Sequence, residues 1–127
     1  MKKEIITTNN APAPIGPYNQ AIKVGNTLYI SGQIPLIPSS MKLFSGTIKE
    51  EAQLVMEHLQ AILKAADMTF EQVVKSSIFL DDMEHFGEVN QVYGAYFDNE
   101  TAPARETVAV KTLPKSVRVE ISMIAVK

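Results

Sequence analysis

The alternation of apolar and polar residues along the 127-residue chain predicts two helices and six strands. Apolar residues recur at helical spacing from Thr47 to about Ala66, and a second stripe runs from about Met83 to Phe97. Shorter segments rich in β-branched and aromatic residues predict strands. These segments are residues 3–7, 21–24, 27–33, 70–80, 105–110 and 117–126.

Turn and cap signals support these boundaries. Gly25-Asn26 is a two-residue hairpin signal between the second and third strands. Thr47, with Glu50 three residues later, forms a capping-box pattern at the start of the first helix. The prolines of segment 9–17 exclude regular structure there, and segment 39–45 also predicts a loop.

The order of these elements indicates an α+β fold in a single domain spanning residues 1–127. Two amphipathic helices are expected to cover one face of a mixed sheet of about six strands. No element in the chain is left to cover the other face, which carries apolar residues. A subunit interface is the expected way to bury that face.

Composition narrows the classes of partner. The net charge of -2 gives no electrostatic attraction to nucleic acid or to an anionic membrane. The chain contains no cysteine, which excludes disulfides and a thiolate nucleophile. No apolar run approaches the roughly 20 residues of a membrane span, and the basic N-terminus lacks the apolar core of a signal peptide. We therefore expect a cytoplasmic protein without nucleic-acid or membrane partners.

Several common catalytic arrangements are absent from the sequence. It has no glycine-rich phosphate loop and no nucleophile elbow. Its two histidines have no further ligands at a metal-binding spacing, so neither a zinc site nor a Ser-His-Asp triad is expected. One of them, His58, lies off the apolar face of the first helix and is expected at the surface. The polar residues left at loop and strand ends are Tyr18, Ser31, Arg105, Thr107 and Glu120.

An arginine and a carboxylate stand out in this group. Arg105 follows a proline-led turn at the mouth of an apolar core strand, and its rigid fork of donors suits a carboxylate. Glu120 is a carboxylate in the middle of a strand, where carboxylates are depleted. Together they could hydrolyse an electrophile such as an imine. The residues alone also allow a structural salt bridge between Arg105 and Glu120.

Two further residues have open interpretations. Gly32, beside Ser31 at a strand end, allows close approach of a ligand or another backbone segment, or else marks a β-bulge. Asn90 lies beside the apolar stripe of the second helix, where capping or packing is the expected role.

An ordered set of short motifs runs through nearly the whole chain. The motifs are Ala13-Pro-Ile-Gly-Pro-Tyr18, Ile30-Ser-Gly-Gln-Ile-Pro35, Val89-Asn-Gln-Val-Tyr93, Pro103-Ala-Arg105, Leu113-Pro-Lys115 and Val119-Glu-Ile-Ser-Met-Ile-Ala125. In order and spacing, this set resembles the RidA (YjgF) family.

The resemblance implies a chorismate-mutase-like fold and a homotrimer with a central β-barrel and clefts between subunits. It also implies hydrolysis of reactive enamine and imine intermediates, such as 2-aminoacrylate, to 2-keto acids and ammonia, without a metal or organic cofactor. By matching position, Arg105 would hold the substrate carboxylate and Glu120 would position the attacking water. Tyr18 and Ser31 would line the same cleft, and the backbone at Thr107 would contact the substrate.

The chain departs from the family pattern after the arginine. Many deaminating relatives have Pro-Ala-Arg-Ser-Cys where this chain has Pro103-Ala-Arg-Glu-Thr107, so a cleft cysteine is missing. A backbone contact at residue 107 would tolerate threonine. Glu106 adds a negative charge beside Arg105, although strand alternation turns it away from the cleft. The alternative function is that of a non-catalytic family member, which binds a small carboxylate metabolite in the same cleft for regulation.

Overall fold

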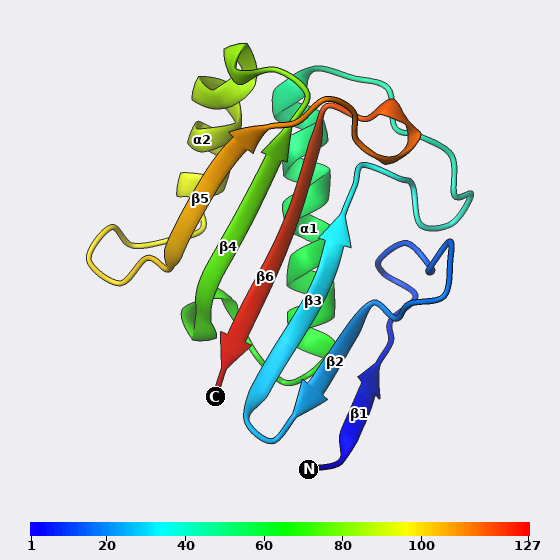
Figure 1. Cartoon of the computed structure of the whole chain (residues 1–127), viewed down its shortest axis with the longest axis vertical. Coiled ribbons are helices and arrows are strands. Elements are labelled where there is room, and N and C mark those ends of the chain that lie inside the picture. Colours follow the sequence, from blue (N-terminus) through cyan, green and yellow to red (C-terminus); the bar gives the residue numbers. More distant parts are fainter.

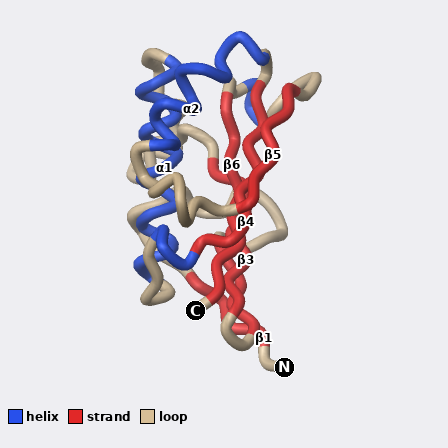
Figure 2. Tube along the Cα trace, turned by 90° about the vertical axis from the view of Figure 1, so that its left-hand side faces the viewer, coloured by secondary structure: helices blue, strands red, loops and turns tan.

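The computed structural model describes residues 1–127 as one sheet with two helices packed on one of its faces (Figures 1 and 2). In chain order the elements are β1 (Lys3–Ile6), β2 (Ala21–Val24), β3 (Thr27–Gln33), α1 (Ile48–Ala65), β4 (Val73–Leu80), α2 (Phe86–Gly94), β5 (Ala104–Ala109) and β6 (Val119–Val126). Short 3-10 turns occupy Phe70–Gln72, Met83–His85 and Pro114–Ser116. The predicted α+β class and order of elements are confirmed.

The strands lie in the order β1-β2-β3-β6-β4-β5 (Figure 1). β4 and β5 are parallel because α2 connects them across the sheet, and all other neighbouring strands are antiparallel. The sheet is therefore mixed, as predicted. β5 is an edge strand that pairs only with β4, and most of its residues are exposed. The expectation that Arg105 opens a core strand is wrong, since no further strand covers this edge.

Local capping explains where two elements differ from the prediction. Residues 70–72 form a 3-10 turn rather than the start of a strand, because the side chain of Gln72 accepts a hydrogen bond from the backbone N–H of Thr69 at 2.8 Å. The Asp82 carboxylate likewise accepts from the backbone N–H of Glu84 at 2.8 Å and begins a 3-10 turn. The α-helix proper then begins at Phe86 and ends at Gly94.

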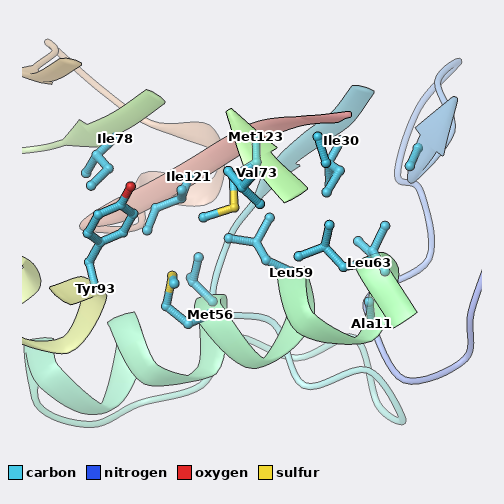
Figure 3. Packing of buried hydrophobic residues seen from close by; sticks show 14 of the residues in the cluster. Ala11, Ile30, Met56, Leu59, Leu63, Val73, Ile78, Tyr93, Ile121 and Met123 are labelled. Atoms are coloured by element: carbon cyan, nitrogen blue, oxygen red, sulfur yellow. The ribbon is translucent and has the colours of Figure 1, made fainter. Parts of the chain in front are cut away.

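The core lies between the sheet and the two helices. Figure 3 shows Met56 and Leu59 of α1 pointing toward Ile121 and Met123 of β6. All four side chains are almost fully buried. Burial of one such side chain contributes about 1.5–3 kcal/mol, so this layer fixes the position of β6 against α1. Neither helix is long and apolar enough to cross a membrane.

The sheet face opposite the helices is open (Figure 2). The strand register places Ile5, Ile22, Tyr29 and Ile124 in one row across this face. Ile5 is 54% exposed and Tyr29 50% exposed. The chain therefore leaves a row of large apolar side chains uncovered, as the strand pattern predicts. Such rows on a protein surface usually mark an interface.

The prediction that His58 lies at the surface is wrong. The side chain is only 1% exposed, and its Nε2 lies 2.7 Å from the carbonyl oxygen of Leu36. The connector between β3 and α1, residues 34–47, folds over the flank of α1 on which His58 lies. This connector has no periodic pattern, so the helical pattern alone could not show that it covers the helix.

Candidate functional site

A pocket of about 360 Å³, which we call the Glu120 pocket, lies between the proline-rich loop, β3 and β6. Tyr18, Ser31 and Glu120 all line it. Its remaining wall is mainly apolar and includes Ile34 and Leu36. Three of the five site residues expected from the sequence therefore come together here.

One buried amide, that of Gln20, holds the proline-rich loop in place. Its Nε2 donates to the carbonyl oxygens of Pro12 at 2.9 Å and Thr8 at 3.0 Å, and its Oε1 accepts from the Thr8 N–H at 2.8 Å. The loop then places Tyr18, whose hydroxyl accepts from the backbone N–H of Ile15 at 3.2 Å. Sequence reasoning gave no role to Gln20, because a single buried amide has no periodic signature.

Gly32 marks a β-bulge, one of the two interpretations that the sequence left open, and the group that approaches it closely is a side chain rather than a ligand or another backbone segment. The register between β3 and β6 shifts between Ile30 and Gln33, which is the bulge. The carboxylate of Glu120 also lies directly over Gly32, and a Cβ atom there would be 2.8 Å from the Glu120 Cδ. Beside it, the Ser31 hydroxyl donates to the Asn19 carbonyl at 2.6 Å, which fixes its orientation. A glycine is thus needed for the carboxylate to reach its place.

Glu120 has no hydrogen-bond or salt-bridge partner within the chain, and its side chain is partly buried. Burial raises the pKa of its carboxyl above the ordinary value of 4.5, because water no longer fully solvates the charged form. A carboxylate with a raised pKa is a better proton acceptor near neutral pH than an exposed one. Unpaired, and facing a pocket, Glu120 is suited to act as a base.

Arg105 lines a second pocket, of about 410 Å³, which we call the Arg105 pocket. Its Nη1 donates to the Oδ1 of Asn90 at 2.7 Å. The guanidinium carbon lies 5.1 Å from the ring centroid of Tyr93 and 5.8 Å from that of Phe86. These three partners occupy one stripe of α2, so the helix presents two aromatic faces and one amide to the guanidinium.

The expected packing or capping role of Asn90 is therefore incomplete, because the side chain also orients Arg105. The sequence signal for Asn90 is a polar residue beside an apolar stripe. That Arg105 is its partner depends on how α2 packs against β5, which the sequence pattern does not show. Arg105 itself forms no salt bridge, which leaves its remaining guanidinium N–H groups free for a ligand.

Within one chain, Arg105 and Glu120 lie on opposite faces of the sheet. Arg105 is paired in register with Ser76 of β4, which is buried under α2 and accepts a hydrogen bond from Tyr93 at 2.9 Å. Glu120 is paired with Phe79, three residues further along β4, and odd spacings alternate faces. The alternative of a salt bridge between Arg105 and Glu120 within the chain is therefore wrong.

Thr107 shares the face of Arg105, as strand alternation predicts, because it is paired in register with Ile78. Its hydroxyl is buried and has no hydrogen-bond partner, and it does not line the Arg105 pocket. Glu106 turns to the other face, where it binds Lys75 at 2.9 Å and the Ser77 hydroxyl. The negative charge next to Arg105 in sequence is thus held away from its guanidinium.

No three His, Asp or Glu side chains come together in a cluster that could hold a metal ion. The chemistry that the arrangement itself offers is an anion clamp at Arg105 and a base with nearby hydroxyls at Glu120. Because the two lie on different faces, one small molecule can touch both only if they come from two copies of the chain.

Comparison with known proteins gives a consistent family. A family model described as Endoribonuclease L-PSP matches residues 8–127. A RutC family protein from Pyrococcus horikoshii is 49% identical over 125 residues, covering 98% of this chain and 98% of that protein. A 2-iminobutanoate/2-iminopropanoate deaminase from Mus musculus is 48% identical over 125 residues, covering 98% of this chain and 92% of that protein. The crystal structure of RidA from the Antarctic bacterium Psychrobacter sp. superposes with a TM-score of 0.92 at 43% identity, covering 98% of this chain and 99% of that one. The chain therefore belongs to the RidA (YjgF) family.

Proposed function

We propose that the protein hydrolyses reactive 2-imino acids, and their enamine forms such as 2-aminoacrylate, to 2-keto acids and ammonia. The observation that carries the proposal is a pair of charged side chains, neither of which has an oppositely charged partner within the chain. Arg105 is an oriented guanidinium without a carboxylate partner, and Glu120 is a partly buried carboxylate without any partner. Support also comes from the mouse relative, which is named for the deamination of 2-iminobutanoate and 2-iminopropanoate.

We assign to Arg105 the role of binding the substrate carboxylate. A guanidinium can form two parallel hydrogen bonds to a carboxylate, and the contact with Asn90 sets the plane of the fork. The rings of Tyr93 and Phe86 limit its movement. Charge-assisted bonds of this kind contribute about 1.5–3 kcal/mol each, so a two-point clamp accounts for most of the binding of a small acid.

We assign to Glu120 the role of positioning and deprotonating the attacking water. Glu120 accepts a proton as the water oxygen forms a bond to the imine carbon, and it passes this proton to the nitrogen, which receives the electron pair of the C=N bond. The resulting carbinolamine then loses ammonia, because its hydroxyl proton is transferred through Glu120 to the nitrogen as the C–N bond breaks and the C=O bond forms. Water adds and ammonia leaves, so no oxidant or reductant is needed. Tyr18 and Ser31 supply hydroxyls at the same pocket, and the backbone at Thr107 is assigned a substrate contact beside Arg105.

The active cleft is assigned to the junction of two copies in a homotrimer with a central β-barrel. The open sheet face supports this assembly, because its apolar row needs a cover. The opposite orientation of Arg105 and Glu120 supports it too, since each chain then contributes one half of every cleft. A closed ring of three identical contacts leaves no face unpaired.

The description of the family model names an endoribonuclease, which is a different reaction class. The Glu120 pocket contains no lysine or arginine, and the chain carries a net charge of -2. A groove that follows a phosphate backbone needs a line of basic side chains. The residues at the pocket therefore favour a small acid over RNA.

The proposal is tested by generating 2-iminopropanoate from alanine with an amino acid oxidase and following release of the keto acid above the spontaneous rate. The wild type is expected to accelerate this release. Arg105→Ala is expected to lower kcat/KM by about 100-fold or more, because the carboxylate clamp is worth about 3 kcal/mol. Lys111→Ala removes an exposed cation outside both pockets and is the matched control. Binding of keto acids without turnover would instead favour the regulatory binding role.

A further inference from the structure

The apolar wall of the Glu120 pocket belongs to the connector between β3 and α1. Ile34 and Leu36 line the pocket from this connector. The connector contains no helix or strand, and it folds back on itself through the bonds from Ile37 N–H to the Lys42 carbonyl at 2.8 Å and from Phe44 N–H to the Pro35 carbonyl at 2.9 Å. The position of the pocket wall therefore depends on what fastens this connector to the rest of the chain.

Two polar side chains on one flank of α1 hold the connector in place, His58 directly and Glu51 through Arg118. His58 bonds the Leu36 carbonyl near the beginning of the connector. Two helical turns earlier, Glu51 pairs with Arg118, whose Nη2 donates to the Gly46 carbonyl at 2.9 Å near the end of the connector. The anchor at Gly46 lies away from the pocket, whereas the anchor at Leu36 acts on a residue of the pocket wall.

The bond from His58 is the only hydrogen bond that the Leu36 carbonyl accepts. A carbonyl can only accept, so the Nε2 of His58 carries the hydrogen and donates it. Burial lowers the pKa of His58, which keeps the ring neutral at neutral pH. Without this donor, a buried carbonyl would lose its partner, and that penalty exceeds the contribution of an ordinary hydrogen bond. The connector could regain a partner only by moving toward water.

We propose that His58 is a positioning residue that holds the Leu36 wall in the place where the substrate side chain is received, and so sets the size of side chain that the site accepts. This role rests on the proposed imine hydrolysis and adds to it a residue that determines which substrates are accepted. In that reaction Arg105 takes the carboxylate and Glu120 takes the water. The apolar wall is then left for the alkyl side chain of the imino acid.

Three variants separate this role from a general effect on the core. His58→Leu keeps apolar volume and removes the donor, while His58→Gln restores an uncharged N–H donor at a similar reach. Met56→Leu is the matched control, because Met56 is equally buried on α1 but does not line the pocket, and the change conserves volume. If His58→Leu does not fold, His58→Met takes its place, since its flexible chain fills irregular space without donating.

Two readouts are needed, one of which does not require turnover. The first is the Kd, by calorimetry, of 2-oxobutanoate and of the bulkier 4-methyl-2-oxopentanoate. The second is KM and kcat for the corresponding imines. His58→Leu is expected to weaken binding of the bulkier acid about 10-fold, which is the effect of about one misplaced methylene contact. The smaller acid is expected to change less than about 2-fold, and His58→Gln is expected to restore both.

Several results would overturn the inference. Equal weakening of both acids, the same selectivity change in Met56→Leu, or a lower Tm with unchanged Kd and KM would each show that His58 has no positioning role. Binding of both acids by a wild type without imine turnover would instead overturn the proposed function, while the comparison of Kd values would still decide the role of His58. A wild type that binds neither acid would overturn both.

Discussion

Gly32→Ala is expected to remove most of the hydrolytic activity while leaving the fold intact. A Cβ atom at position 32 would lie 2.8 Å from the Cδ and 3.0 Å from the Cγ of Glu120, and it would overlap the Oε2 atom. Carbon atoms in contact ordinarily lie about 3.5–4.0 Å apart. The Glu120 carboxylate must therefore withdraw from its place by about 1 Å.

The effects on stability and on activity should separate. The Glu120 carboxylate is the free end of a flexible side chain with no partner, so it can turn away at little cost to folding. Gly32 has no left-handed backbone angle, and alanine restricts the unfolded chain by about 0.5–1 kcal/mol more than glycine does. The free energy of unfolding should therefore stay within about 1 kcal/mol of the wild type. A displacement of about 1 Å in a catalytic group costs about 100-fold in rate, so kcat/KM should fall by that factor.

Urea denaturation and initial rates of imine hydrolysis on the same preparations measure the two effects. Gly87→Ala is the matched control, because a Cβ atom at this exposed position in α2 would meet nothing within 4 Å. Gly32→Ala is also made in a Glu120→Gln background, where it should cause no further loss, because both changes act through the same carboxylate. Unchanged kcat/KM in the single variant, or a further tenfold loss in the double variant, would show that Gly32 does not act by making room for the Glu120 carboxylate.

Three other predictions concern the neighbouring groups. Asn90→Ala should raise KM about tenfold with little change in kcat, since the amide orients Arg105 for binding. A lower kcat with little change in KM, measured by steady-state kinetics, would instead show that Asn90 acts in the chemical step. Thr107→Val should raise the free energy of unfolding by about 1 kcal/mol, because it removes a buried hydroxyl that has no partner; a destabilised variant in urea would show that the hydroxyl is satisfied in the assembly. The pH profile of kcat/KM should fall on the acid side with a midpoint above 4.5, because Glu120 must be ionised to accept a proton and burial raises its pKa. Glu120→Gln should lack this acid limb, and a wild-type midpoint below 4.5 would exclude Glu120 as the titrating group.

Much of the fold could be predicted from the sequence because each helix and most strands bury one face, and burial imposes a period on the apolar residues. The stripe of α1 and the capping pair of Thr47 and Glu50 are local signals, and both are present in the structure. His58 was misplaced because the connector that covers it has no period of its own. The apolar content of β5 predicts a core strand, but apolar content does not reveal how many neighbouring strands a strand has.

The sequence singles out candidate residues for the site but not their arrangement. Arg105 and Glu120 were recognisable because a cation and a carboxylate are unusual in apolar strands. Their separation follows from the register of Ser76 and Phe79 in β4, which no local pattern reveals. The contact between Asn90 and Arg105 likewise depends on the path of α2 from β4 to β5.

Subunit complementation shows whether Arg105 of one copy and Glu120 of another form a single active cleft. Arg105→Ala and Glu120→Gln are each expected to be almost inactive. When the two are unfolded, mixed in equal amounts and refolded together, about three quarters of the trimers should contain both variants, and each of these has one cleft in about three with both residues intact. The refolded mixture should therefore recover roughly a quarter of the wild-type activity. A mixture as inactive as its parents would contradict a cleft shared between subunits.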